Sequence, residues 1–256
     1  MNSAVISSFD TSMVLFSIAF SVVGSFVALV AAGRINRADG TLNRGNIISA
    51  GLALGGVGVW SMHFVGMLAL KMDVGSSYSL LETVVSLVAA IVGTSLAFGY
   101  AARAPKDLPR IMLAGFLLGL GVVVMHYLGM YGLKINGYIQ WNFVYVAASV
   151  AIAVVAATAA LWLGFNSNSL TKRLAAAVVM GAAVCTMHYV GMAAADFICT
   201  TESRDAIPQG WGYISRFTLP SLVIVITLLM ITMISLDQFY QYTVTKFGAR
   251  NQTRAL

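Results

Sequence analysis

The stretch Met62-His63-Phe64-Val65-Gly66-Met67 recurs twice along the chain, as Met125-His126-Tyr127-Leu128-Gly129-Met130 and as Met187-His188-Tyr189-Val190-Gly191-Met192. The chain contains three histidines, and each of them stands in one copy of this hexapeptide. The second histidine follows the first by 63 residues and the third follows the second by 62. A polar, metal-competent side chain confined to one repeated position indicates a functional site rather than core filling.

The composition places this chain in a lipid bilayer. Hydrophobic residues make up 59%, charged residues only 9%, and the mean hydropathy is +0.86, which excludes an ordinary soluble domain. Strict polar and apolar alternation is absent, so the apolar runs predict helices rather than a membrane barrel. We therefore expect an all-α membrane protein with seven transmembrane helices of about 20 residues or more, near residues 12–33, 46–70, 79–102, 111–133, 143–164, 174–197 and 217–236.

The distribution of positive charge predicts the orientation. Most lysines and arginines fall in the loops 34–45, 103–110 and 165–173 and in the tail 237–256. The positive-inside rule then places these segments in the cytoplasm. It makes residues 1–11 an outer N-terminal arm and residues 237–256 a polar cytoplasmic tail. The net charge of +6 follows from this asymmetry, so no nucleic-acid partner is implied.

The repeat extends beyond the hexapeptide. Gly56, Gly119 and Gly181 each lie seven residues before the motif histidine, on spans 2, 4 and 6. The unit is therefore a helix hairpin of about 63 residues, used three times, with the seventh span outside the repeat. Each copy enters the membrane from the same side. The three hairpins should be parallel and related by an axis along the membrane normal, which brings the histidines to one depth in the outer half of the bilayer.

Within each copy, a methionine follows the histidine by four residues and shares its helix face. A glycine between them, at 66, 129 or 191, removes bulk from that face, so that another helix or a ligand can approach. Imidazole and thioether are soft, neutral ligands that suit copper, above all Cu(I). We therefore expect a copper site whose ligands are His63, Met67, His126, Met130, His188 and Met192. The leading methionines are turned about 100° away and are secondary candidates: Met62, Met125 and Met187.

Several alternatives stay open at this point. The histidines could form a hydrogen-bonded cluster, or two of them could hold a b-type haem. Rings of His and Met could conduct Cu(I), or serve a membrane oxidoreductase that uses copper or haem. Glu82 at the start of span 3 could orient an imidazole. No catalytic constellation is visible, so we do not expect an enzyme in this chain.

Three Met-His-[Phe/Tyr]-x-Gly-Met copies on alternate spans of a seven-span chain resemble the MHYT domain of bacterial integral-membrane sensors. The likeness covers about residues 10–236, with Phe64 as the one departure from tyrosine. It implies a copper site near the outer face of the bacterial inner membrane, with a role in sensing oxygen, carbon monoxide or nitric oxide. It also implies a cytoplasmic signalling domain or partner, such as a cyclic-di-GMP enzyme or a DNA-binding domain. Only some twenty residues follow span 7, so we expect either a stand-alone member or a chain cut before its output domain.

Overall fold

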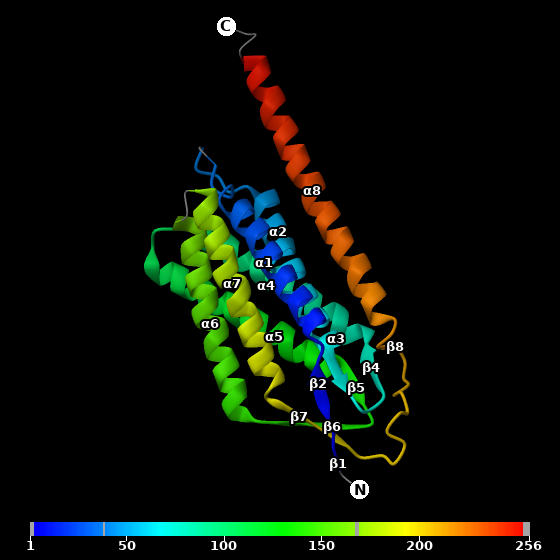
Figure 1. Cartoon of the computed structure of the whole chain (residues 1–256). Helices are drawn as coiled ribbons and strands as arrows, with labels where there is room; N and C mark the ends of the chain where they lie inside the picture. The colour runs from blue at the N-terminus through cyan, green and yellow to red at the C-terminus, as the bar shows by residue number, and fades with distance from the viewer. Residues whose placement is uncertain (1–2, 38, 167–168, 253–256) are drawn as a thin grey trace.

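The computed structural model describes residues 3–37, 39–166 and 169–252. Long helices run side by side in one bundle, with short strands gathered at one end near the N-terminus and the C-terminus at the other (Figure 1). We call these the strand end and the C-terminal end. Seven helical segments are long and apolar enough to cross a bilayer. The helices are α1 (Thr11–Ala32), a continuous run of α2 (Arg44–Gly51), η1 (Leu52–Ser61) and α3 (Met62–Ala69), then α4 (Leu80–Ala102), α5 (Leu108–Gly132), α6 (Phe143–Asn166), α7 (Leu170–Met192) and α8 (Leu219–Gln252).

The fold class predicted from the sequence is confirmed, although some bounds differ. The last five residues of the expected span 174–197 are not helical, because α7 ends at Met192 and a strand begins at Ala195. Helix α8 continues through the expected tail as far as Gln252. The expected N-terminal arm contains two strands. Residues 253–256 of the tail lie outside the described part of the chain.

Polar residues placed just before the apolar runs start several helices. Asp10 caps α1 by accepting hydrogen bonds from the amides of Ser12 and Met13. Asn43 caps α2 through the amide of Asn46, and Ser169 caps α7 through that of Lys172. These side chains satisfy amides that have no partner inside the helix.

The short strands at the strand end were not predicted, and they follow the repeat. They are β1 (Ser3–Ala4), β2 (Ser7–Phe9), β3 (Leu70–Met72), β4 (Ser76–Ser79), β5 (Leu133–Ile135), β6 (Gly137–Trp141), β7 (Ala195–Cys199) and β8 (Tyr213–Ser215). The strand after each motif helix pairs antiparallel with the strand before its hairpin partner: β3 with β2, β5 with β4, and β7 with β6. The repeated unit is therefore strand, helix, helix, strand. Strands β1 and β8 extend two of the three sheets.

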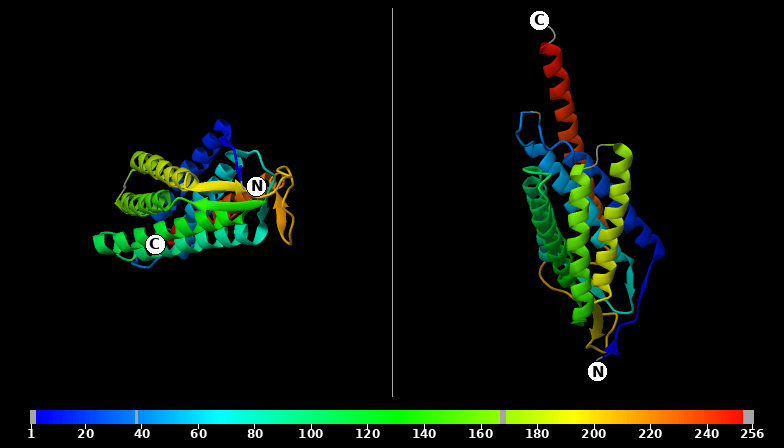
Figure 2. Two further views of the ribbon diagram at one scale, coloured as in Figure 1. Left: turned by 90° about the horizontal axis from the view of Figure 1, so that it is seen from below. Right: turned by 90° about the vertical axis from the view of Figure 1, so that its left-hand side faces the viewer.

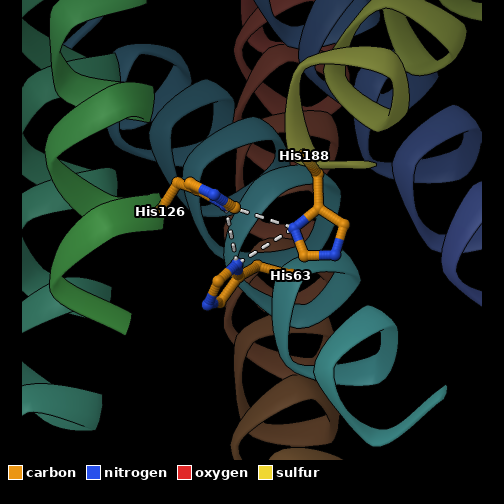
Figure 3. Close-up of side chains that lie close together, drawn as sticks. All are labelled: His63, His126 and His188. Atoms are coloured by element: carbon orange, nitrogen blue, oxygen red, sulfur yellow. Dashed lines mark hydrogen bonds between the residues drawn. The ribbon is translucent and has the colours of Figure 1, made fainter. Parts of the chain in front are cut away.

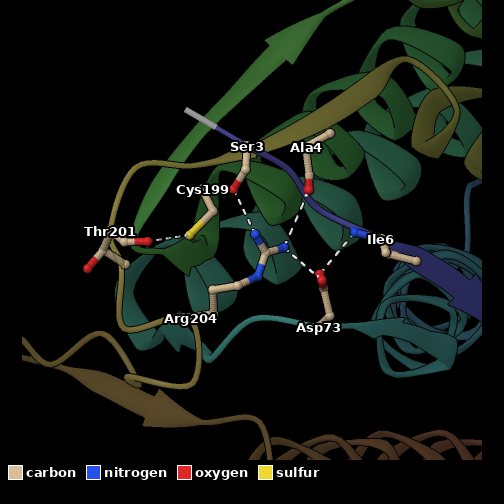
Figure 4. A network of polar contacts seen from close by, with 7 residues as sticks. All are labelled: Ser3, Ala4, Ile6, Asp73, Cys199, Thr201 and Arg204. Carbon is tan, nitrogen blue, oxygen red and sulfur yellow. Dashed lines mark hydrogen bonds and ion pairs between the residues drawn. The ribbon is translucent and has the colours of Figure 1, made fainter. Parts of the chain in front are cut away.

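Further contacts tie the N-terminal arm to this layer of strands. The guanidinium of Arg204 donates hydrogen bonds to the hydroxyl of Ser3 and to the carboxylate of Asp73. Asp73 in turn accepts from the amide of Ile6 (Figure 4). Segments about 200 residues apart in the sequence are thus held together beside the strands.

The six hairpin helices form a closed ring. Helix α4 packs between η1 and α5, α6 between α5 and α7, and α1 between α7 and η1. Helix α8 lies outside the ring against α2, η1 and α3, and projects past the bundle at the C-terminal end (Figure 2). In the second span 94% of the residues of the apolar stretch are buried, because helices lie on every side of it. In the other six spans this share is 28% to 44%.

Small residues allow close packing between neighbours in the ring. A Cβ on Gly55 would clash with the backbone of Ala90 on α4, one on Gly119 with Ala153 on α6, and one on Gly181 with Val22 on α1. Gly55 lies eight residues before its histidine, one more than its two counterparts. The π-helix η1 accommodates this extra residue, so the expected counterpart, Gly56, instead faces Met230 of α8.

Candidate metal centre

The three motif histidines meet on the axis of the ring. His63 comes from α3, His126 from α5 and His188 from α7, and their exposed fractions are 0%, 0% and 1%. The Nδ1 atoms form a triangle with sides of 3.1 Å between His63 and His188 and 3.2 Å for the other two pairs. The ring planes cross at 82° to 89° (Figure 3). The predicted convergence of the histidines is therefore present.

The motif glycines explain how three rings fit at one point. The Nε2 side of His63 lies against Gly129, that of His126 against Gly191, and that of His188 against Gly66. A Cβ on any of these glycines would stand 2.9 to 3.0 Å from the Cδ2 of the facing ring and closer still to its Nε2. Each glycine thus receives the histidine of another repeat, in cyclic order. The sequence had predicted such an approach without identifying its partner.

Three neutral imidazoles cannot satisfy this triangle by hydrogen bonds alone. A ring nitrogen of a neutral imidazole either carries a proton and donates or lacks one and accepts, but does not do both. Around a triangle of three Nδ1 atoms, at least one pair must therefore match donor with donor or acceptor with acceptor. A cation at the centre removes the conflict, because all three nitrogens then act as electron-pair donors toward it.

The spacing fits a small metal ion. Two nitrogen ligands on a tetrahedral ion with bonds of about 2.0 to 2.1 Å are separated by about 3.3 Å, close to the observed 3.1 and 3.2 Å. The triangle is the one group of three or more His, Cys, Asp or Glu ligands found among the described residues that could hold a metal. It would occupy three positions of a tetrahedral ion and leave a fourth for another ligand. In contrast, two axial histidines of a haem bind the iron from opposite faces of the porphyrin, and nitrogen atoms 3.1 and 3.2 Å apart leave no room for a porphyrin between them.

The two sets of methionines are buried to the same extent, so burial does not show which set would bind the metal. Met67, Met130 and Met192 are 0% to 4% exposed, and Met62, Met125 and Met187 are 1% exposed. All six are buried, and each is either the residue before a motif histidine or the fourth residue after it. Which set supplies a thioether stays a prediction.

Glu82, expected to orient an imidazole, has other partners. Its carboxylate accepts from the hydroxyl of Ser79 and lies 3.1 Å from Nζ of Lys134. Lys71 makes the matching ion pair in the first unit, 2.8 Å from Asp10. Both lysines follow the motif histidine by eight residues, so the acidic group joins the two helices of one hairpin at the strand end. Cys185 and Cys199 are both buried free thiols, and neither belongs to the histidine group.

In the second and third motifs, the tyrosine after the histidine is hydrogen-bonded to a serine that sequence reasoning missed. The hydroxyl of Tyr127 lies 2.7 Å from Ser149 Oγ, and that of Tyr189 lies 2.8 Å from Ser17 Oγ. Each serine donates its own proton to the carbonyl three residues earlier, so the tyrosine must be the donor. These contacts join each motif to the neighbouring hairpin.

The first motif has Phe64 in place of tyrosine, and a different residue takes over the contact. The indole Nε1 of Trp60 donates to Oγ of Ser86 at 3.2 Å and to the carbonyl of Thr83 at 3.0 Å. Ser17, Ser86 and Ser149 are each the seventh residue of their helix. This shared position is the signal that could have identified them.

A small apolar cavity of about 20 Å³ lies beside the histidines, toward the C-terminal end. Val59, Val122 and Val184, each four residues before a motif histidine, line it together with Met187 and with alanines of α6 such as Ala157. Its volume matches about one water molecule, but an apolar lining keeps such a cavity dry. The alternative of a Cu(I) conduit would need polar or thioether groups here, and the methionines that line the cavity, Met180 and Met187, both come from α7.

Comparison with known proteins agrees with this geometry. The MHYT family profile, described as a bacterial signalling protein N-terminal repeat, matches residues 56–114, 119–177 and 181–239. Each match begins in a motif helix a few residues before the hexapeptide. The first two run into the next hairpin and the third runs into α8, so the profile has the same period as the hairpins but begins at a different point of the repeat. No solved structure matches the chain.

The curated relatives are signalling proteins. The bifunctional diguanylate cyclase/cyclic di-GMP phosphodiesterase MucR of Pseudomonas aeruginosa is 37% identical over 235 residues, which is 88% of this chain and 33% of the relative. The signaling protein YkoW of Bacillus subtilis is 25% identical over 209 residues, 79% of this chain and 25% of the relative. The cyclic di-GMP phosphodiesterase NbdA of P. aeruginosa is 33% identical over 145 residues, 54% of this chain and 18% of the relative.

The chain thus spans a third or less of the length of these relatives. It is a multi-pass membrane protein related to their sensor parts. Its three repeats carry a buried group of three histidines, one from each motif. On the family profile and the likeness to MucR, this chain belongs to the MHYT family of bacterial membrane signalling domains.

Proposed function

We propose that this chain is a copper-binding sensor domain that responds to a diatomic gas such as O2, CO or NO. His63, His126 and His188 would hold the ion through Nδ1, with Met67, Met130 and Met192 as thioether candidates. The observation that carries the proposal is the buried Nδ1 triangle, whose sides of 3.1 and 3.2 Å suit a common ion and whose hydrogen bonds cannot all be satisfied without one.

The chemistry of the site favours copper. Imidazole and thioether form a neutral, soft ligand set, which suits Cu(I) better than the hard cations Mg²⁺ or Ca²⁺. When bound, the ion would have a fourth position beside the three imidazoles, which a thioether would fill in the resting site and a small gas would take in its place. The residues of the chain hold the three nitrogens in place and exclude water, because all three rings are buried.

The surroundings of the triangle suit an apolar ligand. A diatomic gas is small and poorly hydrated, so it can reach the site through the hydrocarbon of the bilayer. The cavity beside the triangle is apolar, and of its lining residues Ala156, Ala183 and Val184 are partly exposed on the outside of the bundle. This arrangement supports entry between α6 and α7.

Helix α8 is the proposed route of the signal. Two residues before His63, the hydroxyl of Ser61 lies 2.8 Å from that of Thr227 on α8. Gly56, five residues before Ser61, has no side chain and so leaves space for the sulfur of Met230 on α8. At the C-terminal end, Asp237 accepts hydrogen bonds from Ser49 of α2 and from Gln241. A ligand that favours one packing of η1 over another would therefore shift α8.

We further propose that the strand end faces outward and that α8 leads into the cytoplasm of a bacterial inner-membrane protein. The basic loops at the C-terminal end support this orientation. Three relatives carry cyclic-di-GMP enzyme or signalling names, which supports a signalling enzyme or partner as the receiver. Catalysis is not assigned to the chain itself.

Metal analysis of the purified full chain tests the proposal. We expect about one copper per chain, lost when all three histidines become alanine. Met67→Leu, Met130→Leu and Met192→Leu together should weaken Cu(I) binding, whereas the same changes at Met62, Met125 and Met187 should have a smaller effect. Equal effects of the two sets would refute the assignment of the methionines. A protein that folds and binds no copper at all would refute the site.

A further inference from the structure

We infer that a groove at the C-terminal end of the bundle binds an anionic phospholipid, independently of the metal centre. The groove has a volume of about 1140 Å³ and lies between the loop before α2, α2 itself, α4 and α5. Arginines line its outer end, and apolar or small residues line its inner end. Its outer lining includes Arg37, Arg44 and Arg103, and its inner lining includes Ile47, Gly93, Leu96, Gly99 and Leu117.

The three arginines form a positive rim, and one carboxylate, that of Asp39, lies near enough to interact with the charge of Arg37. All three are exposed, and no ion pair within the described ranges joins any of them to an acidic side chain. Asp39 and Asp237 both make hydrogen bonds to groups other than these arginines. Asp39 accepts from the amide and hydroxyl of Thr41, and Asp237, near Gly45, accepts from Ser49 and Gln241. A phosphate diester would supply the missing negative charge, and guanidinium groups bind phosphate oxygens through paired N–H donors.

The length of the groove matches one leaflet of a bilayer. Gly93 lies on α4, ten residues before Arg103, which caps the end of that helix, so the groove extends about 15 Å along the helix axis from its basic rim. That depth equals about half of the roughly 30 Å hydrocarbon core. A lipid with its phosphate at the arginines would therefore place an acyl chain along Leu96 and Leu117.

Small residues make room for that acyl chain. Gly93 and Gly99 are partly exposed on α4, and a Cβ on either would make no contact closer than 3.5 Å. The side chains of Leu96 and Leu117 are exposed and offer apolar surface on α4 and α5. A soluble anion would gain nothing from this inner part. The occupant that fits both parts is therefore a phospholipid, and not free phosphate.

Lipid binding to the full chain in detergent, followed by native mass spectrometry, tests the inference. We expect phosphatidylglycerol to bind at least tenfold more tightly than phosphatidylcholine. Arg37→Gln with Arg103→Gln should remove that preference. Lys106→Gln with Lys172→Gln removes the same charge from exposed positions at the same end and should leave it intact. Equal losses in the two double variants would overturn the inference, since binding would then follow overall charge.

The inner part of the groove needs its own variant. Leu117→Trp fills the groove from α5 and should weaken phosphatidylglycerol binding several-fold, whereas Met112→Trp, at an exposed position on another face of α5, should not. Glycerol phosphate in millimolar excess should fail to displace the lipid. Displacement by glycerol phosphate, or no difference between the two tryptophan variants, would show an anion site in place of a lipid site.

Discussion

Replacing Gly129 with alanine tests the packing of the histidines most directly. The new Cβ would stand 2.9 Å from Cδ2 of His63 and closer to its Nε2, so one of the two groups must move. The ring of His63 is fully buried and cannot swing into open space. We expect it to shift by about 1 Å, which is large against the tolerance of about 0.5 Å for a preorganised site.

The magnitude follows from two opposing effects. Overpacking a well-filled interior costs about 1 to 3 kcal/mol, while alanine in place of glycine inside a helix gains up to about 1 kcal/mol. The fold should therefore survive with a small net loss of stability. Metal affinity should fall further, by roughly 10- to 100-fold, as it does when groups that orient a ligand are lost.

Competition titration with a copper chelator measures the affinity, and thermal unfolding in detergent measures the stability. Gly93→Ala is the matched control, because a Cβ there would lie 3.6 Å from the Cα of Gly121, an ordinary contact. Gly66→Ala and Gly191→Ala should behave like Gly129→Ala. Wild-type copper affinity in all three motif variants would show that the rings do not occupy these positions and would refute the reasoning.

Three further predictions concern the surroundings of the triangle. Tyr127→Phe and Tyr189→Phe should each lower the free energy of unfolding by about 1 kcal/mol, measured by thermal unfolding, because each leaves a buried serine without its donor; an unchanged midpoint would contradict the bracing role. Thr227→Val should uncouple α8 from η1, so that the change in a spin-label distance between α8 and α6 on adding copper becomes smaller than in the wild type, while copper affinity stays the same. Partial desolvation raises the pKa of Asp73, but hydrogen bonds from Arg204 and the Ile6 amide outweigh it and leave the pKa below its ordinary value. The contact between Asp73 and the arm should therefore hold above about pH 4 and be lost as the pH falls through the lowered pKa; hydrogen-exchange protection at Ile6 should fall in that range, and Asp73→Asn should abolish the pH dependence.

The repeated features of the fold could be predicted because the same sequence pattern occurs three times. Helix length follows from the apolar runs, and the recurrence of His63, His126 and His188 fixes a common depth. The glycine in each motif predicted that another group packs closely against it. The identity of that group could not be predicted, because the helix opposite Gly66 depends on the order of the hairpins around the ring. Periodicity within one helix carries no information on that order.

The strands and the ion pairs were not predicted from the sequence, for a different reason. Segments of three to five residues after each motif helix, such as Leu133–Ile135, are too short for a period-two pattern to stand out. Glu82 was expected near an imidazole because both lie toward the same surface. Its partner is Lys134, which reaches it because β4 and β5 pair and bring the ends of α4 and α5 together.

The departures from threefold symmetry gather in the first repeat, and on the proposed signalling route they would let one helix report on a symmetric site. A symmetric triangle acts equally on α3, α5 and α7, so it gives no direction to a signal. The π-helix η1 with its extra residue, Trp60 in place of the tyrosine contact and Ser61 with its bond to Thr227 all lie in the motif helix that carries α8. In the described structure α5 and α7 lack such a π segment, so η1 is the element through which a change in ring packing at the triangle would act differently on the first repeat. If η1 is the element that moves, removing one residue from it should make the first repeat resemble the other two, keep the histidines together, and break the contact with α8.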